Sequence, residues 1–197
     1  MPLTTQQIQG LDIGLNEATL LGVEVDTDRR LAAVTFAVFT LPESGPPSAD
    51  RRVQFLFWPI GRVVASLRTG HWDDPTAEIV KFEVEDLLSV VQSFDGLDIY
   101  GWEFFDVNDG KGFIDWASRV SLDYRSGSDG LIHTLDLFQE GAERHLDLRI
   151  WFDELMLRNA DGEEISWEEF VAGGERWWNG LNRGDERTQG FGIELLK

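Results

Sequence analysis

The sequence predicts an α+β fold that is mainly antiparallel β-sheet, arranged as a meander, a sandwich-like pair of sheets or a partly closed barrel. Apolar and polar residues alternate over most of the chain, turn-forming residues separate these runs, and helical spacing is confined to two segments. A mainly disordered chain is excluded, because 42% of the 197 residues are hydrophobic and 12% are aromatic. We expect a single domain over residues 1–197, with 1–95 and 96–197 as its candidate halves, since predicted strands precede a helix in each.

The first half of the chain contains four predicted strands. They cover residues 18–26, 31–40, 52–58 and 62–68. Asp26–Arg29 has the composition of a hairpin turn, and the Gly, Pro and Ser residues of Pro42–Asp50 predict a loop. Pro59–Gly61 is expected to separate the third strand from the fourth.

A short helix is predicted near residues 85–94. Its apolar residues Leu87, Leu88, Val91 and Phe94 have helical spacing. Two acidic residues occupy its first turn, where the helix dipole stabilises negative charge.

The second half of the chain predicts a four-stranded meander followed by a helix. The strands are expected at 97–106, 112–124, 131–139 and 144–157, joined by turns at Asn108–Gly110, Ser126–Gly130 and Gly141–Ala142. Ser166 and Glu169 form a capping-box pattern that opens a helix near 166–180. Gly173 and Gly174 weaken that helix and indicate either a break or a close backbone contact.

The charge is strongly negative and unevenly distributed. The chain has 36 Asp and Glu against 17 Lys and Arg, a net charge of −19. Residues 71–123 alone hold 13 acids and three bases, whereas residues 1–70 are nearly neutral. This charge disfavours nucleic acids and anionic membranes as partners and favours a basic protein or a metal ion.

The absence of cysteine excludes disulfides, thiolate zinc sites, iron–sulfur clusters and cysteine nucleophiles. The N-terminal residues lack the pattern of a secretory signal, and no run of apolar residues is long enough to span a membrane. We therefore expect a cytoplasmic protein. Its basic residues are mostly Arg, which is typical of a GC-rich bacterial genome.

One candidate site is a group of carboxylates on the meander. If Gly141–Ala142 is a two-residue hairpin loop, Asp136 faces Asp147 and Phe138 faces His145. Opposed carboxylates repel, so an arginine, a cation, solvent or a shared proton must offset them. Asp123, Asp136, Asp147 and His145 are the catalytic candidates of a metal-dependent hydrolase or lyase. The alternative is that the aspartates form the solvated face of a half-buried sheet with Arg149. The opposite face is expected to be core and includes His133, Leu135, Leu137, Leu146, Leu148 and Ile150.

Metal binding has two candidate positions. Asp136 and Asp147 form the first, and His71 with Asp73, in a loop after a predicted strand, forms the second. For the loop, an ordinary turn is the alternative. A divalent metal is the only cofactor that these residues predict.

A partner-binding surface is predicted where aromatic residues alternate with acids. Its candidate residues are Trp102, Glu103, Asp106 and Asp109. Exposed, they would suit a basic partner, and the alternative is a strand that is buried on both sides.

Three functions follow from these features, and no motif identifies a family. The first is a non-enzymatic protein-binding domain, resembling an immunity protein or antitoxin in its role, with a basic partner. The second is the metal-dependent enzyme, and the third is a small-ligand binding module with Trp102 and Trp116 as walls of its pocket. The oligomeric state stays open.

Overall fold

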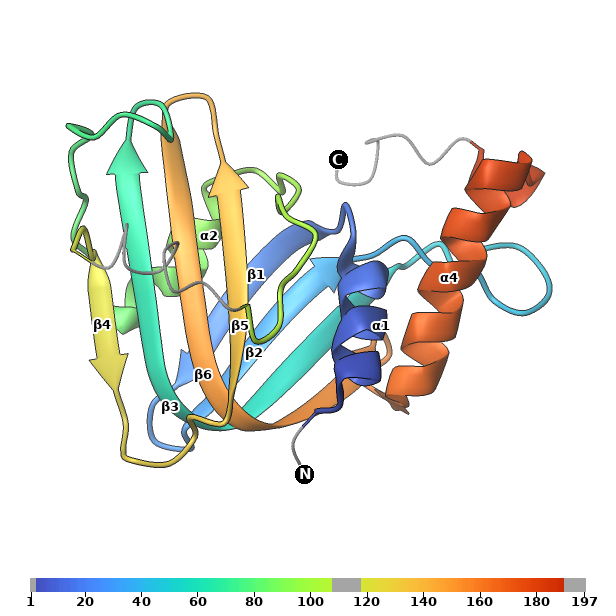
Figure 1. The fold of residues 1–197 in the computed structure, drawn as a ribbon, viewed down its shortest axis with the longest axis horizontal. Coiled ribbons are helices and arrows are strands. Elements are labelled where there is room, and N and C mark those ends of the chain that lie inside the picture. The colour runs from blue at the N-terminus through green and yellow to red at the C-terminus, as the bar shows by residue number, and fades with distance from the viewer. Residues whose placement is uncertain (1–2, 108–117, 190–197) are drawn as a thin grey trace.

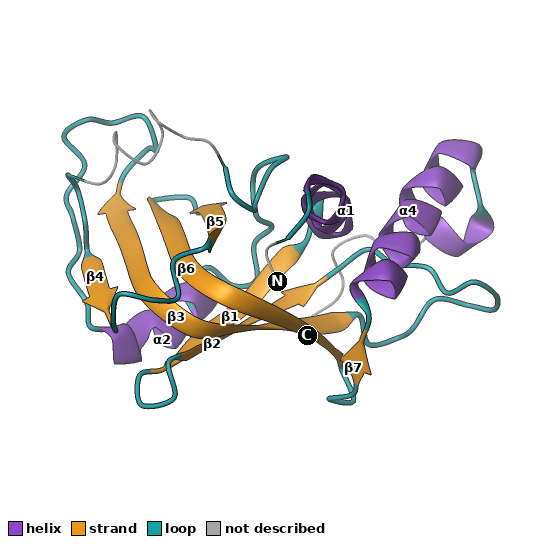
Figure 2. Cartoon of the chain, turned by 60° about the horizontal axis from the view of Figure 1, so that its bottom comes forward, coloured by secondary structure: helices purple, strands orange, loops and turns teal. Residues whose placement is uncertain are grey.

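The computed structural model describes residues 3–107 and 118–189. The fold is α+β, with a mainly antiparallel sheet that curls into a half-barrel (Figures 1 and 2). The helices are α1 (Thr5–Leu15), α2 (Leu87–Gln92) and α4 (Trp167–Arg183), with short 3-10 turns at Val84–Asp86 and Glu186–Thr188. The strands are β1 (Thr19–Asp26), β2 (Leu31–Ala37), β3 (Arg52–Thr69), β4 (Leu122–Arg125), β5 (His133–Glu140), β6 (Arg144–Asn159) and β7 (Glu164–Ile165).

The sheet has the strand order β1-β2-β3-β6-β5, and every pair is antiparallel. In addition, β4 pairs with β3, and β7 pairs with β6. The first part of β3 hydrogen-bonds to β2, and its last part hydrogen-bonds to β4. Figure 1 shows β3 and β6 bending along their length while β1 and β2 cross behind them.

The predicted separation of residues 52–58 from 62–68 is wrong, because β3 is one continuous strand of 18 residues. The residues expected to interrupt the strand are accommodated by a β-bulge, which shifts the register against β6 between Ile60 and Arg62. Gly61 lies at this bulge, and its N–H donates to the Gly130 carbonyl oxygen at 2.9 Å. A Cβ at Gly61 would lie 2.4 Å from the Asp129 carbonyl oxygen, so this close crossing of two chain segments requires glycine.

The predicted strand at 97–106 is also wrong, but this segment bonds to both edges of the sheet. Ile99 N–H donates to the Ala18 carbonyl oxygen beside β1 at 2.9 Å, and Tyr100 N–H donates to the Phe138 carbonyl oxygen of β5 at 3.0 Å. Further along, Asp136 N–H donates to the Phe104 carbonyl oxygen at 2.7 Å. We call residues 97–106 the closing segment. It does not form a regular strand, because its pairing with the sheet is limited to isolated bridges at Asp98 and Phe105.

Most other predicted elements are confirmed. The strands at 18–26, 31–40, 131–139 and 144–157 correspond to β1, β2, β5 and β6, and the helices near 85–94 and 166–180 to α2 and α4. Of the strand predicted at 112–124, the described part contains only β4, and residues 112–117 lie outside the described residues. Helix α1 was not predicted.

Most of the buried apolar side chains form one cluster, to which the sheet and the three described helices contribute. Helices α1 and α4 cross at two glycines: a Cβ at Gly174 would lie 3.0 Å from the Gly14 Cα. The pair Gly173–Gly174 therefore marks a close backbone contact, one of the two predicted alternatives, and α4 continues without a break. None of the described helices is long and apolar enough to cross a membrane.

Candidate functional site

Two regions of the described structure bring acidic candidate residues together with other functional side chains. The first, which we call the polar sheet face, is the side of β4, β3, β6 and β5 opposite the core. Its charged residues and histidine include Arg62, Arg68, Asp123, Arg125, Asp136, Glu140, His145, Asp147 and Arg149. One row across the four strands runs Asp123, Val64, Arg149, Asp136. The three candidate aspartates share a face with Arg149, as predicted. The predicted core residues of the opposite face are buried: His133, Leu135, Leu137, Leu146, Leu148 and Ile150.

The predicted pairing of Asp136 with Asp147 is wrong, because the hairpin turn lies one residue later than expected. Gly141 N–H donates to the Arg144 carbonyl oxygen at 2.8 Å, so the turn residues are Ala142 and Glu143. Moving the turn by one residue moves every cross-strand partner by two positions. Asp136 therefore faces Arg149.

The same shift changes the partners of the other candidates. Asp147 faces Phe138 on β5, and His145 faces Glu140. The predicted pair of Phe138 and His145 is accordingly wrong, although their rings lie 6.2 Å apart between centroids.

Each of the three candidate aspartates binds an arginine. Asp123 accepts two hydrogen bonds from Arg62, at 2.7 and 2.9 Å, which lower the pKa of its carboxyl group. Asp136 binds Arg149, and Asp147 binds Arg68. These pairs supply the compensating charge that a row of aspartates needs.

The predicted solvated face is only partly so: Asp123 is exposed and the other two candidate aspartates are half-buried, but three of the basic side chains of this face are buried. The exposed fractions of Arg68, Arg149 and His145 are 7%, 6% and 0%. Burial raises the pKa of Asp147 to about 6, although the neighbouring Arg68 acts in the opposite direction. Burial also lowers the pKa of His145, and its Nε2 has no hydrogen-bond partner in the described structure.

The second metal candidate lies apart from this face, on the exposed loop after β3. His71 Nδ1 is 2.6 Å from Asp73 Oδ1, and this contact raises the pKa of His71. Its Nε2 is 3.9 Å from a carboxylate oxygen of Glu140. Within residues 3–107 and 118–189, no group of three or more Asp, Glu or His side chains has the arrangement of a metal site.

The predicted partner-binding residues separate into two groups. Asp106 is engaged at the start of β5, where its carboxylate lies 2.7 Å from His133 Nδ1 and accepts the Thr134 N–H at 2.8 Å. Trp102 and Glu103 instead line a cleft, and the exposed fraction of Trp102 is 85%. Asp109, and Trp116 of the small-ligand hypothesis, lie outside the described residues.

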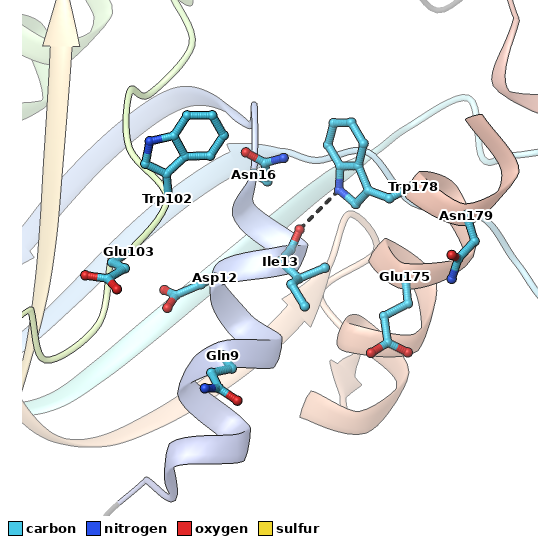
Figure 3. A pocket seen from close by; sticks show the side chains of 9 residues that line it. All are labelled: Gln9, Asp12, Ile13, Asn16, Trp102, Glu103, Glu175, Trp178 and Asn179. Carbon is cyan, nitrogen blue, oxygen red and sulfur yellow. Dashed lines mark hydrogen bonds between the residues drawn. The ribbon is translucent and has the colours of Figure 1, made fainter. Parts of the chain in front are cut away.

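We call this second acidic region the tryptophan cleft (Figure 3). Its volume is about 790 Å³, and it lies between α1, α4 and the closing segment. The lining residues are Gln9, Asp12, Ile13, Asn16, Trp102, Glu103, Glu175, Trp178 and Asn179. The residues from each helix have the spacing of a single helical face, which explains why two helices side by side present them to one cleft.

Two hydrogen bonds fix the walls of the cleft. Trp178 Nε1 donates to the Ile13 carbonyl oxygen at 3.2 Å, which joins α4 to the last turn of α1. Asp12 Oδ1 accepts the Phe104 N–H at 2.9 Å, which joins α1 to the closing segment. Trp102 and Glu103 directly precede this anchored residue.

The cleft has a negative character. None of the described residues that line it is basic. The pKa of Asp12 is raised, first by burial and then by the charges of Glu103 and Asp106, while two backbone N–H groups act in the opposite direction. In addition, α1 ends at Leu15, beside the cleft, and the C-terminal end of a helix carries partial negative charge. Such a site favours a cation.

The sequence analysis found one wall of this cleft and missed the others. The missed wall on α1 had a signal: Thr4 and Gln7 form a capping box in the structure, and this spacing is visible in the sequence. The wall on α4 could be predicted only by knowing that α1 packs beside α4 in the folded chain. No family model, curated protein or solved structure matches the chain.

Proposed function

We propose that the protein is a non-enzymatic binding domain that receives a basic segment of a partner protein in the tryptophan cleft. The observation that carries this proposal is the exposed Trp102 beside Glu103, Asp12 and Glu175, in a cleft without a basic side chain among its described lining residues. An indole this exposed contributes little to the core of its own protein, and a partner that covered it would bury a large apolar area.

The chemistry of the cleft supports a basic partner. Indole faces attract ammonium and guanidinium groups, and carboxylates bind them through charge-assisted hydrogen bonds. Tryptophan is also among the residues that contribute most to protein interfaces. The net charge of −19 attracts a basic protein over longer distances and raises its association rate at low salt.

A metal-dependent enzyme has less support from the geometry, because each of its three candidate aspartates binds an arginine. A small-ligand module has more support, since the cleft volume of about 790 Å³ lies in the range of small-molecule sites. A free organic cation would use the same tryptophans and carboxylates as a basic protein segment. The polypeptide is favoured because the cleft also presents the exposed apolar side chain of Ile13, and Tyr100, two residues before Trp102, is exposed as well.

The test is an NMR titration of the protein with a decapeptide of alternating basic and glycine residues, in which three of the basic residues are Lys and two are Arg. A decapeptide with Glu in place of the basic residues is the control ligand. We expect the indole N–H signals of Trp102 and Trp178 to shift with the basic peptide only, and the affinity to fall as salt is raised.

Two variants locate the binding site. Trp102→Ala removes the exposed indole from the cleft, whereas Trp72→Ala removes an exposed indole beside His71, outside the cleft. We expect the first variant to weaken binding and the second to leave it unchanged. Equal binding of both decapeptides, or unchanged affinity of Trp102→Ala, would contradict the proposal.

A further inference from the structure

We infer, on the basis of the proposed function, that the group bound in the tryptophan cleft is an arginine side chain of the partner, which stacks its guanidinium on indole and binds the cleft carboxylates. The inference concerns which cation the cleft selects. It is supported by the shapes of the walls, the number of acceptors and the openness of the site to water.

The walls are two indoles at the same end of the cleft. In Figure 3 the rings of Trp102 and Trp178 stand on either side of Asn16. The Trp178 ring is held by its hydrogen bond to Ile13, so its orientation is set before any ligand arrives. The Trp102 ring is almost fully exposed and is free to lie against a ligand. A flat guanidinium stacks on such a face, whereas a compact ammonium does not.

The acceptors outnumber the three donors of an ammonium group. Carboxylates come from three elements: Asp12 from α1, Glu103 from the closing segment and Glu175 from α4. In Figure 3 the Asp12 carboxylate points toward Glu103, and Trp102 lies beside both. The amide side chains of Gln9, Asn16 and Asn179 add further carbonyl oxygens. A guanidinium has five N–H donors in a rigid plane and can bind several of these acceptors at once.

The cleft is open, and this also favours arginine. Two of its carboxylate residues, Glu103 and Glu175, are exposed, as is Trp102. A lysine ammonium is strongly hydrated and would keep its water in an open site. A guanidinium is more weakly hydrated, so it gives up water to an aromatic face at lower cost.

The experiment compares three tripeptides with blocked ends, Gly-Arg-Gly, Gly-Lys-Gly and Gly-citrulline-Gly, by the same NMR titration. Citrulline is the neutral analogue of arginine with nearly the same shape. We expect the arginine peptide to shift the indole signals of Trp102 and Trp178 and to bind at least about threefold more tightly than the lysine peptide. The citrulline peptide should produce no shift at these indoles.

Variants separate stacking from charge. Trp102→Ala should remove the difference between arginine and lysine, whereas Glu175→Gln should weaken both peptides. The controls are Trp72→Ala, outside the cleft, and Glu168→Gln, an exposed glutamate elsewhere on α4. Both controls should bind the arginine peptide as the wild type does.

The outcomes distinguish this inference from the proposed function. Equal affinity for arginine and lysine, or for arginine and citrulline, overturns the inference, and the proposed function stands if the basic decapeptide still binds at Trp102. If neither the tripeptides nor the basic decapeptide shifts the indoles of the cleft, both fail together.

Discussion

The polar sheet face and the tryptophan cleft both concentrate acidic side chains, but only the first neutralises them from within. On the sheet face, Asp123, Asp136 and Asp147 bind Arg62, Arg149 and Arg68, and two of these arginines, Arg149 and Arg68, are buried. In the cleft, two indoles and three amide side chains lie with the carboxylates, and none of the described lining residues is basic.

This difference separates a structural arrangement from one that is available to a ligand. Buried charges persist in a fold only when they are paired, so arginines beside the aspartates of the sheet face are what stability requires. In the cleft, Glu103 and Glu175 are exposed and Asp12 accepts hydrogen bonds from backbone N–H groups, while burial and the charges of Glu103 and Asp106 raise the pKa of Asp12. Local departures from good packing and pairing are expected where a protein binds something else.

The largest effect on stability is expected when an arginine is removed from the sheet face. Arg149→Met removes the buried guanidinium that binds the half-buried Asp136 and that lies 5.5 Å from the centre of the Trp151 ring. Breaking a buried ion pair in this way costs about 3 to 5 kcal/mol. We expect a loss of this size in the free energy of unfolding, measured by urea denaturation.

The matched control for this loss is Arg125→Met. Arg125 also contacts a carboxylate of the same face, but its side chain is 66% exposed and Asp123 keeps Arg62 as its partner. Exposed ion pairs contribute at most about 1 kcal/mol. Similar losses for both variants would mean that the sheet face is no more dependent on its ion pairs than the surface is.

The next effect is a pH dependence from Asp147. Its pKa is about 6 in the folded protein against 3.8 for the ordinary group, so the folded state binds a proton that the unfolded state has released between these values. Protonation therefore stabilises the fold as pH falls, and the contribution is lost as pH rises through 6. Relative to Asp147→Asn, the wild type should gain about 2 kcal/mol in the free energy of unfolding between pH 7 and pH 4.5.

The control for this prediction is the same measurement on Asp123→Asn. The pKa of Asp123 is lowered by Arg62, so its contribution has the opposite sign and is lost as pH falls. A difference between wild type and Asp147→Asn that does not change with pH would contradict a raised pKa for Asp147.

A smaller effect is expected where the helices that build the cleft meet. In Gly14→Ala the new Cβ would lie 2.2 Å from the ring of Phe170, which is buried, so α1 and α4 must move apart. Overpacking costs about 1 to 3 kcal/mol, and the better helix propensity of alanine returns up to about 1 kcal/mol. We expect a net loss of about 1 to 2 kcal/mol together with a shifted indole signal of Trp178.

Gln6→Ala, an exposed change on the same helix, is the control for Gly14→Ala. It should alter neither the stability nor the Trp178 signal. If Gly14→Ala leaves the Trp178 signal in place, the glycine contact does not set the position of that wall of the cleft.

The sequence predicted the sheet face well and the cleft poorly, for a physical reason. Alternation along a strand assigns Asp123, Asp136 and Asp147 to one side of a sheet without any knowledge of the other strands. Their partners depend on the turn between β5 and β6, and an error of one residue there replaced an ion pair with a pair of like charges. The cleft depends on three segments that meet only in the folded chain. Composition identified Trp102 and Glu103, but nothing local in the sequence indicates that Asp12 and Glu175 lie near them.

The smallest change in the free energy of unfolding is expected when carboxylates of the cleft are neutralised. The sign of this change distinguishes the cleft from the sheet face. Glu103→Gln and Glu175→Gln each remove an exposed negative charge from a cleft that has no basic side chain among its described lining residues. We expect each to change the free energy of unfolding by less than about 0.5 kcal/mol, and Glu103→Gln to be the more stabilising because its charge raises the pKa of Asp12. The same pair of changes should weaken binding of the basic decapeptide while leaving the fold intact. A charge that costs stability where it stands and is needed for a ligand is a functional charge. A measured loss of stability for Glu103→Gln would instead place that carboxylate with the aspartates of the sheet face, as part of the structure.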